Sequence, residues 1–204
     1  MNHITQINNL QTVLGDYDFP IDTISMAGTY DDDCETKLVK CHDRMMIVRT
    51  DTMEYLGNHS TAYRPVEHKA IIDPIYEMVQ KVSKDFVPQI RMMQNGAMMK
   101  ATFTCKDITI QDPALQDYIA FRITVRNSYN GVWSVMITAD GLRYWCKNGC
   151  TTPDRIANYT QKHNGKFYYK FDHIGHLIQE FQCNEERYRA WYNTPVTHHD
   201  ANEM

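Results

Sequence analysis

A hairpin stands out in the alternation of apolar and polar residues over 88–103, where Asn-Gly at 95–96 separates two runs of alternating residues. Asn-Gly is a strong signal for a two-residue turn, because both residues tolerate a positive φ. This turn predicts Arg91 opposite Lys100, on a polar face shared with Thr102. The opposite face would be apolar and would consist of Ile90, Met92, Met99, Ala101 and Phe103.

A second hairpin is expected over 118–138, where Asn-Gly recurs at 130–131. A two-residue turn here would divide the apolar residues between the two faces of the sheet. A three-residue loop over 129–131 keeps them on one face, and it is therefore the preferred prediction. The predicted pairs are Val125–Val135, Ile123–Ile137, Arg126–Ser134 and Arg122–Thr138.

The remaining pattern predicts one more hairpin, over 37–57, and three helices. The first helix would begin at Asp73, an N-cap before Pro74, and end at Pro88. Later helices would begin at Thr152-Pro153 and at Asp172. The apolar side of the last helix would consist of Ile174, Leu177, Ile178, Phe181, Tyr188 and Trp191. This order predicts an α+β fold, an antiparallel sheet built from hairpins with helices packed on one face.

Charge is distributed unevenly along the chain, although the formal net charge is only −4. Residues 1–36 carry −7, residues 37–170 carry +7 and residues 171–204 carry −4. We therefore expect an acidic N-terminal extension (1–36) with a loop at 28–33, one α+β domain (37–192) and a C-terminal tail (193–204). A basic middle suggests nucleic acid or an acidic partner, whereas a solubilising surface excess is the simpler explanation.

Cationic and aromatic side chains are expected to gather on the polar face of the sheet. Like charges placed opposite each other cost free energy, which is easier to understand if an anion such as a phosphate lies across them. The alternative is a solvated face with half-buried tyrosines. The candidate nucleic-acid-binding residues are Arg91, Lys100, Arg122, Arg126, Arg143 and Lys147 for phosphates, with Tyr118, Tyr129 and Tyr144 for stacking on bases.

Two patterns imitate metal sites, and neither is strong enough to predict one. The first is a set of four possible zinc ligands, Cys146, Cys150, His173 and His176, whose spacings lie at the margin of structural zinc patterns. The second is Asp22 with Glu35-Thr36-Lys37, which resembles the acidic residues and lysine of a metal-dependent nuclease. We expect no metal, no cofactor and no enzymatic activity.

Residues 48–66 contain Arg49, Asp51, Leu56-Gly57 and Tyr63-Arg64-Pro65-Val66. This stretch resembles the first block of the phage/plasmid-like proteins, a family of phage and plasmid origin whose molecular function is not settled. Residues 126–149 resemble its second block, except that Tyr129-Asn130 stands where the family has His-Asp. The resemblance covers about residues 37–150 and implies a mobile-element protein that acts in the bacterial host cytoplasm.

The order of elements is also similar to the core of single-strand annealing proteins. The expected function is therefore that of a non-enzymatic phage protein, a homo-oligomer that binds single-stranded DNA and promotes annealing in recombination or replication. The alternative is a phage protein that inhibits a host defence or regulatory protein through its acidic segment. No signal peptide or membrane span is expected, and six sparse cysteines indicate reduced thiols in a cytosolic protein.

Overall fold

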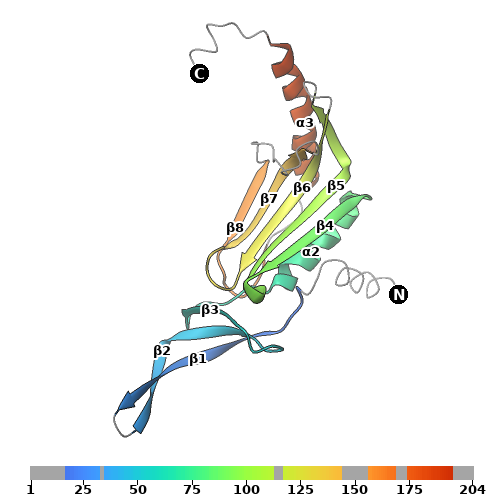
Figure 1. Ribbon diagram of the computed structural model, residues 1–204. Helices are drawn as coiled ribbons and strands as arrows, with labels where there is room; N and C mark the ends of the chain where they lie inside the picture. The colour runs from blue at the N-terminus through green and yellow to red at the C-terminus, as the bar shows by residue number, and fades with distance from the viewer. Residues whose placement is uncertain (1–16, 33–34, 113–116, 144–155, 169–173, 195–204) are drawn as a thin grey trace, which may run out of the picture.

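Antiparallel strands form most of the computed structural model, which describes residues 17–32, 35–112, 117–143, 156–168 and 174–194. The described ranges form two sheets and two α-helices, arranged as in Figure 1, which confirms the predicted α+β class. The elements in chain order are β1 (Ile21–Asp32), β2 (Glu35–Arg49), β3 (Tyr55–Ser60), α2 (His68–Val82), β4 (Phe86–Met93), η1 (Gln94–Gly96), β5 (Met98–Asp112), β6 (Asp117–Ser128), β7 (Val135–Arg143), β8 (Ala157–Gln161) and α3 (Ile174–Asn193).

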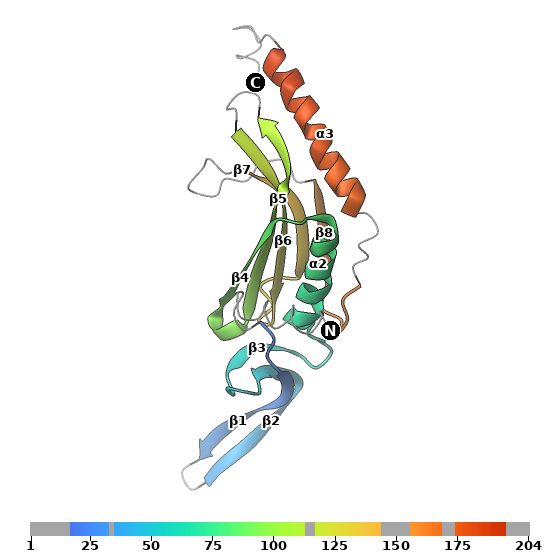
Figure 2. The same ribbon diagram turned by 90° about the vertical axis from the view of Figure 1, so that its right-hand side faces the viewer.

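The larger sheet has the strand order β4-β5-β6-β7-β8, so that strands adjacent in the chain are adjacent in space. Every second residue of β5, β6 and β7 enters the main core, together with apolar residues of α2 and α3. Figure 2 shows both helices on the same side of this sheet. Phe181 of α3 packs against Phe121 of β6 with ring centroids 5.4 Å apart. Helices therefore cover one face, as predicted.

The β4–β5 hairpin has the predicted register, including Arg91 opposite Lys100. Its turn has φ of 56° at Asn95 and 100° at Gly96, the positive values that a type I′ turn requires. The turn is closed by the Ala97 N–H, which donates to the Gln94 carbonyl at 2.9 Å. The predicted apolar residues of both strands all pack in or against the main core.

The β6–β7 register differs by two residues from the prediction, because the loop spans 129–134 and not 129–131. Tyr129 is held away from the turn: its N–H donates to the Ala97 carbonyl at 2.7 Å and its side chain is 1% exposed. The observed pairs are Val125–Ile137, Ile123–Ala139, Arg126–Met136 and Arg122–Asp140. A shift of two residues leaves each side chain on its predicted face.

Helix α2 begins at His68, five residues earlier than predicted, so Pro74 lies inside the helix and Asp73 is not its N-cap. The N-cap position is occupied by Glu67, which makes no side-chain capping bond. The Tyr129 hydroxyl accepts a bond from the His68 N–H at 2.9 Å and satisfies a donor of the first turn. The helix also ends earlier than predicted, and the predicted stop, Pro88, lies in edge strand β4.

The expected acidic loop at 28–33 is wrong over its described residues, because β1 pairs with β2 as far as Asp32 opposite Glu35. Aspartate and glycine favour turns, but here they lie in a strand whose partner supplies the hydrogen bonds. The charge boundary at residue 36 therefore falls within a hairpin. The predicted 37–57 hairpin is seen as the pairing of β2 with β3.

The C-terminal part differs from the prediction in two places. The helix expected from Thr152-Pro153 is wrong at its described end, where Ile156 leads into strand β8, and residues 152–155 lie outside the described part. In α3 the predicted apolar side packs on the core except for Trp191, which is 56% exposed. Asp172 and residues 195–204 also lie outside the described ranges.

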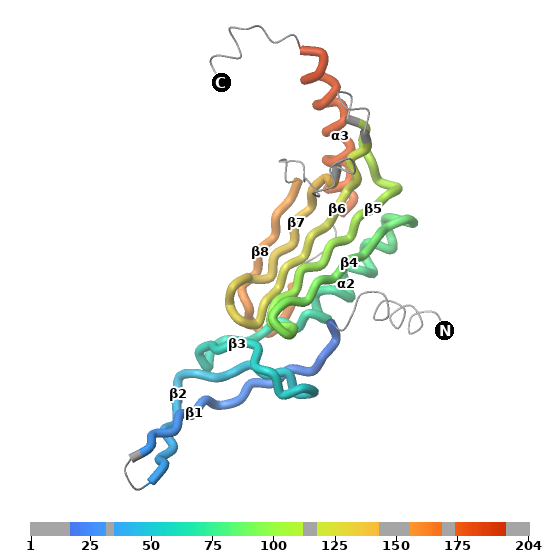
Figure 3. Tube along the Cα trace, viewed as in Figure 1, coloured from blue at the N-terminus to red at the C-terminus, as the bar shows by residue number. Residues whose placement is uncertain are grey.

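A second core joins the two sheets and consists of Phe19, Ile47, Leu56, Ala97 and Tyr129. At this junction β3 approaches the loop after β6 so closely that a Cβ built on Gly57 would lie 2.1 Å from the Tyr129 carbonyl oxygen. The trace in Figure 3 shows β3 beside the turn that connects β4 to β5. Beyond this junction the β1–β2 hairpin projects away from the larger sheet (Figures 1 and 2).

Candidate nucleic-acid interface

Three cations lie side by side across the open face of the larger sheet. Arg91 of β4 is opposite Lys100 of β5, and Lys100 is opposite Arg126 of β6. We call these three residues the cationic row. Opposed side chains in antiparallel strands share a face with Cβ atoms about 5 Å apart, so the row spans roughly 10 Å. Among the described elements, no helix packs on this face (Figure 2).

Arg122 lies on the same face, four residues along β6 from Arg126, but it already has a partner. Its Nε and one terminal nitrogen donate to the two carboxylate oxygens of Asp140 at 2.8 and 3.1 Å. The two side chains are only 12% and 11% exposed. The prediction placed Arg122 opposite Thr138, and the register shift brings Asp140 there instead. Arg122 is therefore a neutralised member of the face.

Lys100 sits at the centre of this positive charge. Its pKa is lowered first by partial burial and then by the neighbouring charges of Arg126 and Arg122, while Asp140 opposes the shift. In the described part of the chain, no carboxylate lies within ion-pair distance of any residue of the cationic row. Burial and three arginines, including Arg91, therefore disfavour the lysine's charged form, which an anion bound across the row would stabilise.

Hydroxyl groups lie along one side of the cationic row. The next positions on this face hold Thr102, Thr124 and Thr138 on β5, β6 and β7, of which Thr124 is buried. A threonine hydroxyl donates a hydrogen bond as well as accepting one, so the half-buried Thr102 and Thr138 can bind phosphate oxygens without adding charge. The face therefore offers both charge and neutral donors to an anionic backbone.

Trp133 is an aromatic residue beside the cationic row, and it was not among the residues predicted to bind nucleic acid. The Arg126 guanidinium carbon lies 5.7 Å from the centre of its ring, within the range of a cation–π contact. The backbone of Trp133 is fixed by the Ser128 hydroxyl, which bonds its N–H at 2.8 Å and its carbonyl at 3.0 Å. The signal available in the sequence was an indole two residues after the predicted turn at 129–131, which follows a strand that contains Arg122 and Arg126.

The predicted tyrosines fare differently. Tyr129 is buried, and burial raises the pKa of its hydroxyl, so the prediction that it stacks on bases is wrong. Tyr118 is 55% exposed and falls on the open face by strand alternation, eight residues along β6 from Arg126. At about 3.3 Å per residue this is roughly 26 Å from the cationic row. Tyr144 lies outside the described residues.

Of the two remaining predicted cations, the one within the described residues does not extend the row. Arg143 ends β7 opposite Ile119, a residue of the main core, so its register position belongs to the helix-covered face. Lys147 lies outside the described part of the chain. The structure therefore brings together Arg91, Lys100 and Arg126, with Arg122 nearby in an ion pair.

Within the described residues, the side chains of the two patterns that imitate metal sites do not come together. Asp22 pairs with Val48 at one end of the β1–β2 hairpin and Glu35 pairs with Asp32 at the other, which separates them by roughly 33 Å along β1. Within the described ranges no group of three potential metal ligands comes together. Cys146, Cys150 and His173 lie outside those ranges, and His176 is an exposed residue of α3.

Comparisons with protein families, with curated proteins and with solved structures find no match to this chain. The resemblance of residues 37–150 to the phage/plasmid-like proteins therefore stays a prediction. Of the helices in the described residues, neither contains a stretch apolar and long enough to cross a membrane.

Proposed function

We propose that the open face of the larger sheet binds single-stranded DNA without catalysing a reaction, and that the protein serves phage recombination or replication in the host cytoplasm. The observation that carries this proposal is the cationic row, in which Lys100 lies between two arginines and no described carboxylate pairs with any of the three. Such crowding costs the free protein stability, and a polyanion on the face offsets that cost.

Single strands fit this face better than a duplex would. The row supplies phosphate contacts on an extended sheet, and Trp133 at its Arg126 end supplies a surface on which an unpaired base can stack. Only a single strand exposes base faces for such stacking. A strand held by its phosphates keeps other bases free to pair with a complementary strand, which is the physical requirement for annealing.

The test measures binding of a fluorescent oligonucleotide at several salt concentrations. The variant Arg91→Ala/Lys100→Ala/Arg126→Ala should bind more weakly, and the slope of log affinity against log salt should fall by about 2, since each phosphate contact on a single strand contributes about 0.7. The matched control is Lys81→Ala/Lys84→Ala/Arg187→Ala, which removes the same charge from exposed cations away from the row.

Absence of salt-sensitive binding by the wild-type protein would overturn the proposal, and so would an equal loss in the control variant. Recovery of one host protein by both the wild type and the cationic-row variant, after nuclease treatment, would favour the alternative of a host-inhibiting protein. Annealing is then measured directly, as the rate at which two complementary labelled oligonucleotides form a duplex in the presence of the protein.

A further inference from the structure

The projecting end of the β1–β2 hairpin has no covering element among the described residues. We define the arm as Met26–Asp32 of β1 with Glu35–Cys41 of β2. Strand β3 pairs with β2 only from Arg44 onward, so the arm is a two-stranded ribbon. A ribbon of two strands is marginally stable by itself in water, because it has few neighbours to bury its side chains.

Large apolar side chains on the arm are exposed to solvent. Tyr30, Leu38 and Val39 are 60%, 64% and 59% exposed. Since Leu38 and Val39 are consecutive in a strand, they point to opposite faces of the ribbon. Docking of one face on a partner would cover only part of this surface. Lateral pairing with another strand brings new side-chain neighbours to both faces.

The edges of the arm are also open. In the strand order β1-β2-β3, β1 is an edge strand along its whole length, and β2 is an edge strand within the arm. Edge strands present backbone N–H and C=O groups to any strand that can pair with them. The arm therefore has two pairing edges, one on β1 and one on β2.

The two edges differ in charge. In the arm, β1 carries Asp31 and Asp32 and no basic residue, whereas β2 carries Lys37 and Lys40, with Glu35 at the turn. A β1 edge against another β1 edge would bring like charges together, and so would β2 against β2. The β2 edge of one molecule against the β1 edge of another is the complementary arrangement.

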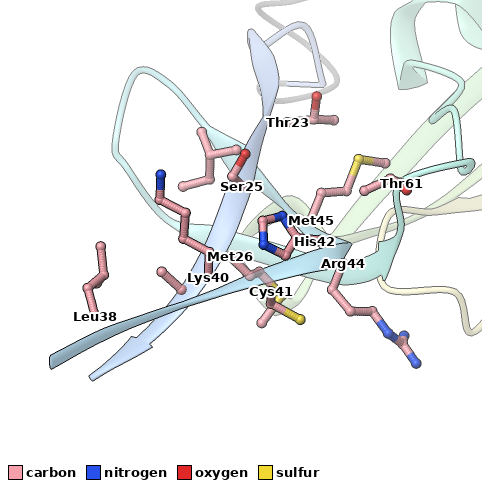
Figure 4. Close-up of a pocket in the computed structure, with 12 residues that line it drawn as sticks. Thr23, Ser25, Met26, Leu38, Lys40, Cys41, His42, Arg44, Met45 and Thr61 are labelled. Carbon is pink, nitrogen blue, oxygen red and sulfur yellow. The ribbon is translucent and has the colours of Figure 1, made fainter. Parts of the chain in front are cut away.

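A hollow lies where the arm joins the rest of the hairpin. The register shift between Ser25 and Met26 leaves residues 42–44 of β2 without partners in β1. The resulting space is about 380 Å³, and Figure 4 shows that side chains of both strands line it. Its lining combines apolar Met26 and Leu38 with cations such as Lys40. The base of the arm is thus incompletely filled by its own side chains, which leaves room for those of a neighbour.

We infer that the arms of successive copies of this chain join into one intermolecular antiparallel sheet, with β2 of each copy beside β1 of the next. The contact is heterologous, because it joins two different surfaces, so repetition yields a closed ring or an open filament. Nothing in this contact requires DNA. It leaves the cationic row of every copy on the larger sheet, outside the interface.

The test uses charge reversal on each edge of the full-length protein, without nucleic acid. Variant one is Lys37→Glu/Lys40→Glu on β2, and variant two is Asp31→Lys/Asp32→Lys on β1. Each variant alone should assemble at least roughly tenfold more weakly than the wild type in sedimentation velocity, because like charges then face each other. An equimolar mixture should regain assembly, since each reversed edge meets its complement.

Folding and DNA binding are controlled separately. The variant Lys162→Glu/Lys166→Glu makes the same charge change on exposed residues outside the arm and should assemble like the wild type. A wild-type protein that stays monomeric at its highest soluble concentration would overturn the inference, as would a mixture that fails to regain assembly while both variants keep the wild-type circular dichroism. Assembly without oligonucleotide binding would instead retain the arm contact and reject the proposed function.

Discussion

Lys100 and Arg126 lie directly opposite each other on β5 and β6, and Arg91 faces Lys100 from the other side. Like charges at opposed positions destabilise a sheet by about 0.2–1 kcal/mol. We therefore expect Lys100→Met to raise the free energy of unfolding at low salt by an amount in this range. The same substitution should weaken binding of single-stranded DNA, because it removes one phosphate contact.

A gain in stability together with a loss of DNA affinity would distinguish a binding site from a face that is merely solvated. Urea denaturation measures the first effect and oligonucleotide titration the second. Lys106→Met, which removes an exposed cation from the same strand, is the matched control and should change neither quantity appreciably. If Lys100→Met is more stable but binds the oligonucleotide as tightly as the wild type, the cations of the row repel one another but do not bind DNA.

Removal of the carboxylate at position 140 should make the face a stronger anion binder. Asp140→Asn frees Arg122 from its two-point ion pair and adds one positive charge to the face. We expect tighter oligonucleotide binding and a salt slope steeper by about 0.7, together with a loss of roughly 3 kcal/mol in stability from the broken, largely buried pair. Unchanged or weaker affinity in a folded variant would contradict this role for Arg122.

The register of a hairpin could be predicted when the hydrogen bonds of its turn lie within the hairpin itself, and not when they come from another segment. The turn at Asn95-Gly96 is closed by its own backbone, and its register follows from local sequence alone. The loop after β6 is held by Ala97, which belongs to a different hairpin, so local rules gave a register wrong by two residues. Another contact of the same residue lies at the start of α2, where the Tyr129 hydroxyl accepts a hydrogen bond from the His68 N–H.

The residues of the candidate site could likewise be predicted only where local sequence determines their positions. Strand alternation placed Arg91, Lys100, Arg122 and Arg126 on one face, and that face is found. The ion pair of Arg122 depends on a register that the sequence did not predict. The burial of Tyr129 depends on the second core, which brings in Phe19 from the segment before β1 and Leu56 from the smaller sheet. Contacts between distant segments leave no periodic pattern in either one, and this is why they were missed.

The approach of β3 to the Tyr129 backbone should make position 57 intolerant of any side chain. A Cβ at Gly57 would lie 2.1 Å from the Tyr129 carbonyl oxygen, which is backbone and cannot rotate away. Gly57→Ala should therefore lower the free energy of unfolding by roughly 2 kcal/mol or more, measured by urea denaturation. Gly28→Ala is the control: nothing lies within 4 Å of its added Cβ, and its effect should stay within about 0.5 kcal/mol. Equal effects at both positions would argue against the close approach.

The junction between the sheets should also make the protein sensitive to acid. The His68 ring is buried: Nε2 lies 2.9 Å from the Gly96 carbonyl and donates to it, so Nδ1 is unprotonated and accepts from the Asn127 amide at 2.9 Å. Burial is the main reason that the pKa of His68 falls from 6.5 to about 4. Burial also lowers the pKa of His163, which lies nearby.

Because the folded-state pKa of His68 lies below the unfolded value, the unfolded chain binds more protons between these two pH values. The stabilisation is therefore complete above about pH 6.5 and is lost as the pH falls toward about 4, by up to roughly 3 kcal/mol from this residue. His68→Gln should be less stable at neutral pH, since it loses ring packing, yet its stability should fall less on acidification. Urea denaturation between about pH 7.5 and about pH 4.5 measures both slopes. If the two proteins lose stability equally across that range, His68 is not the group that titrates.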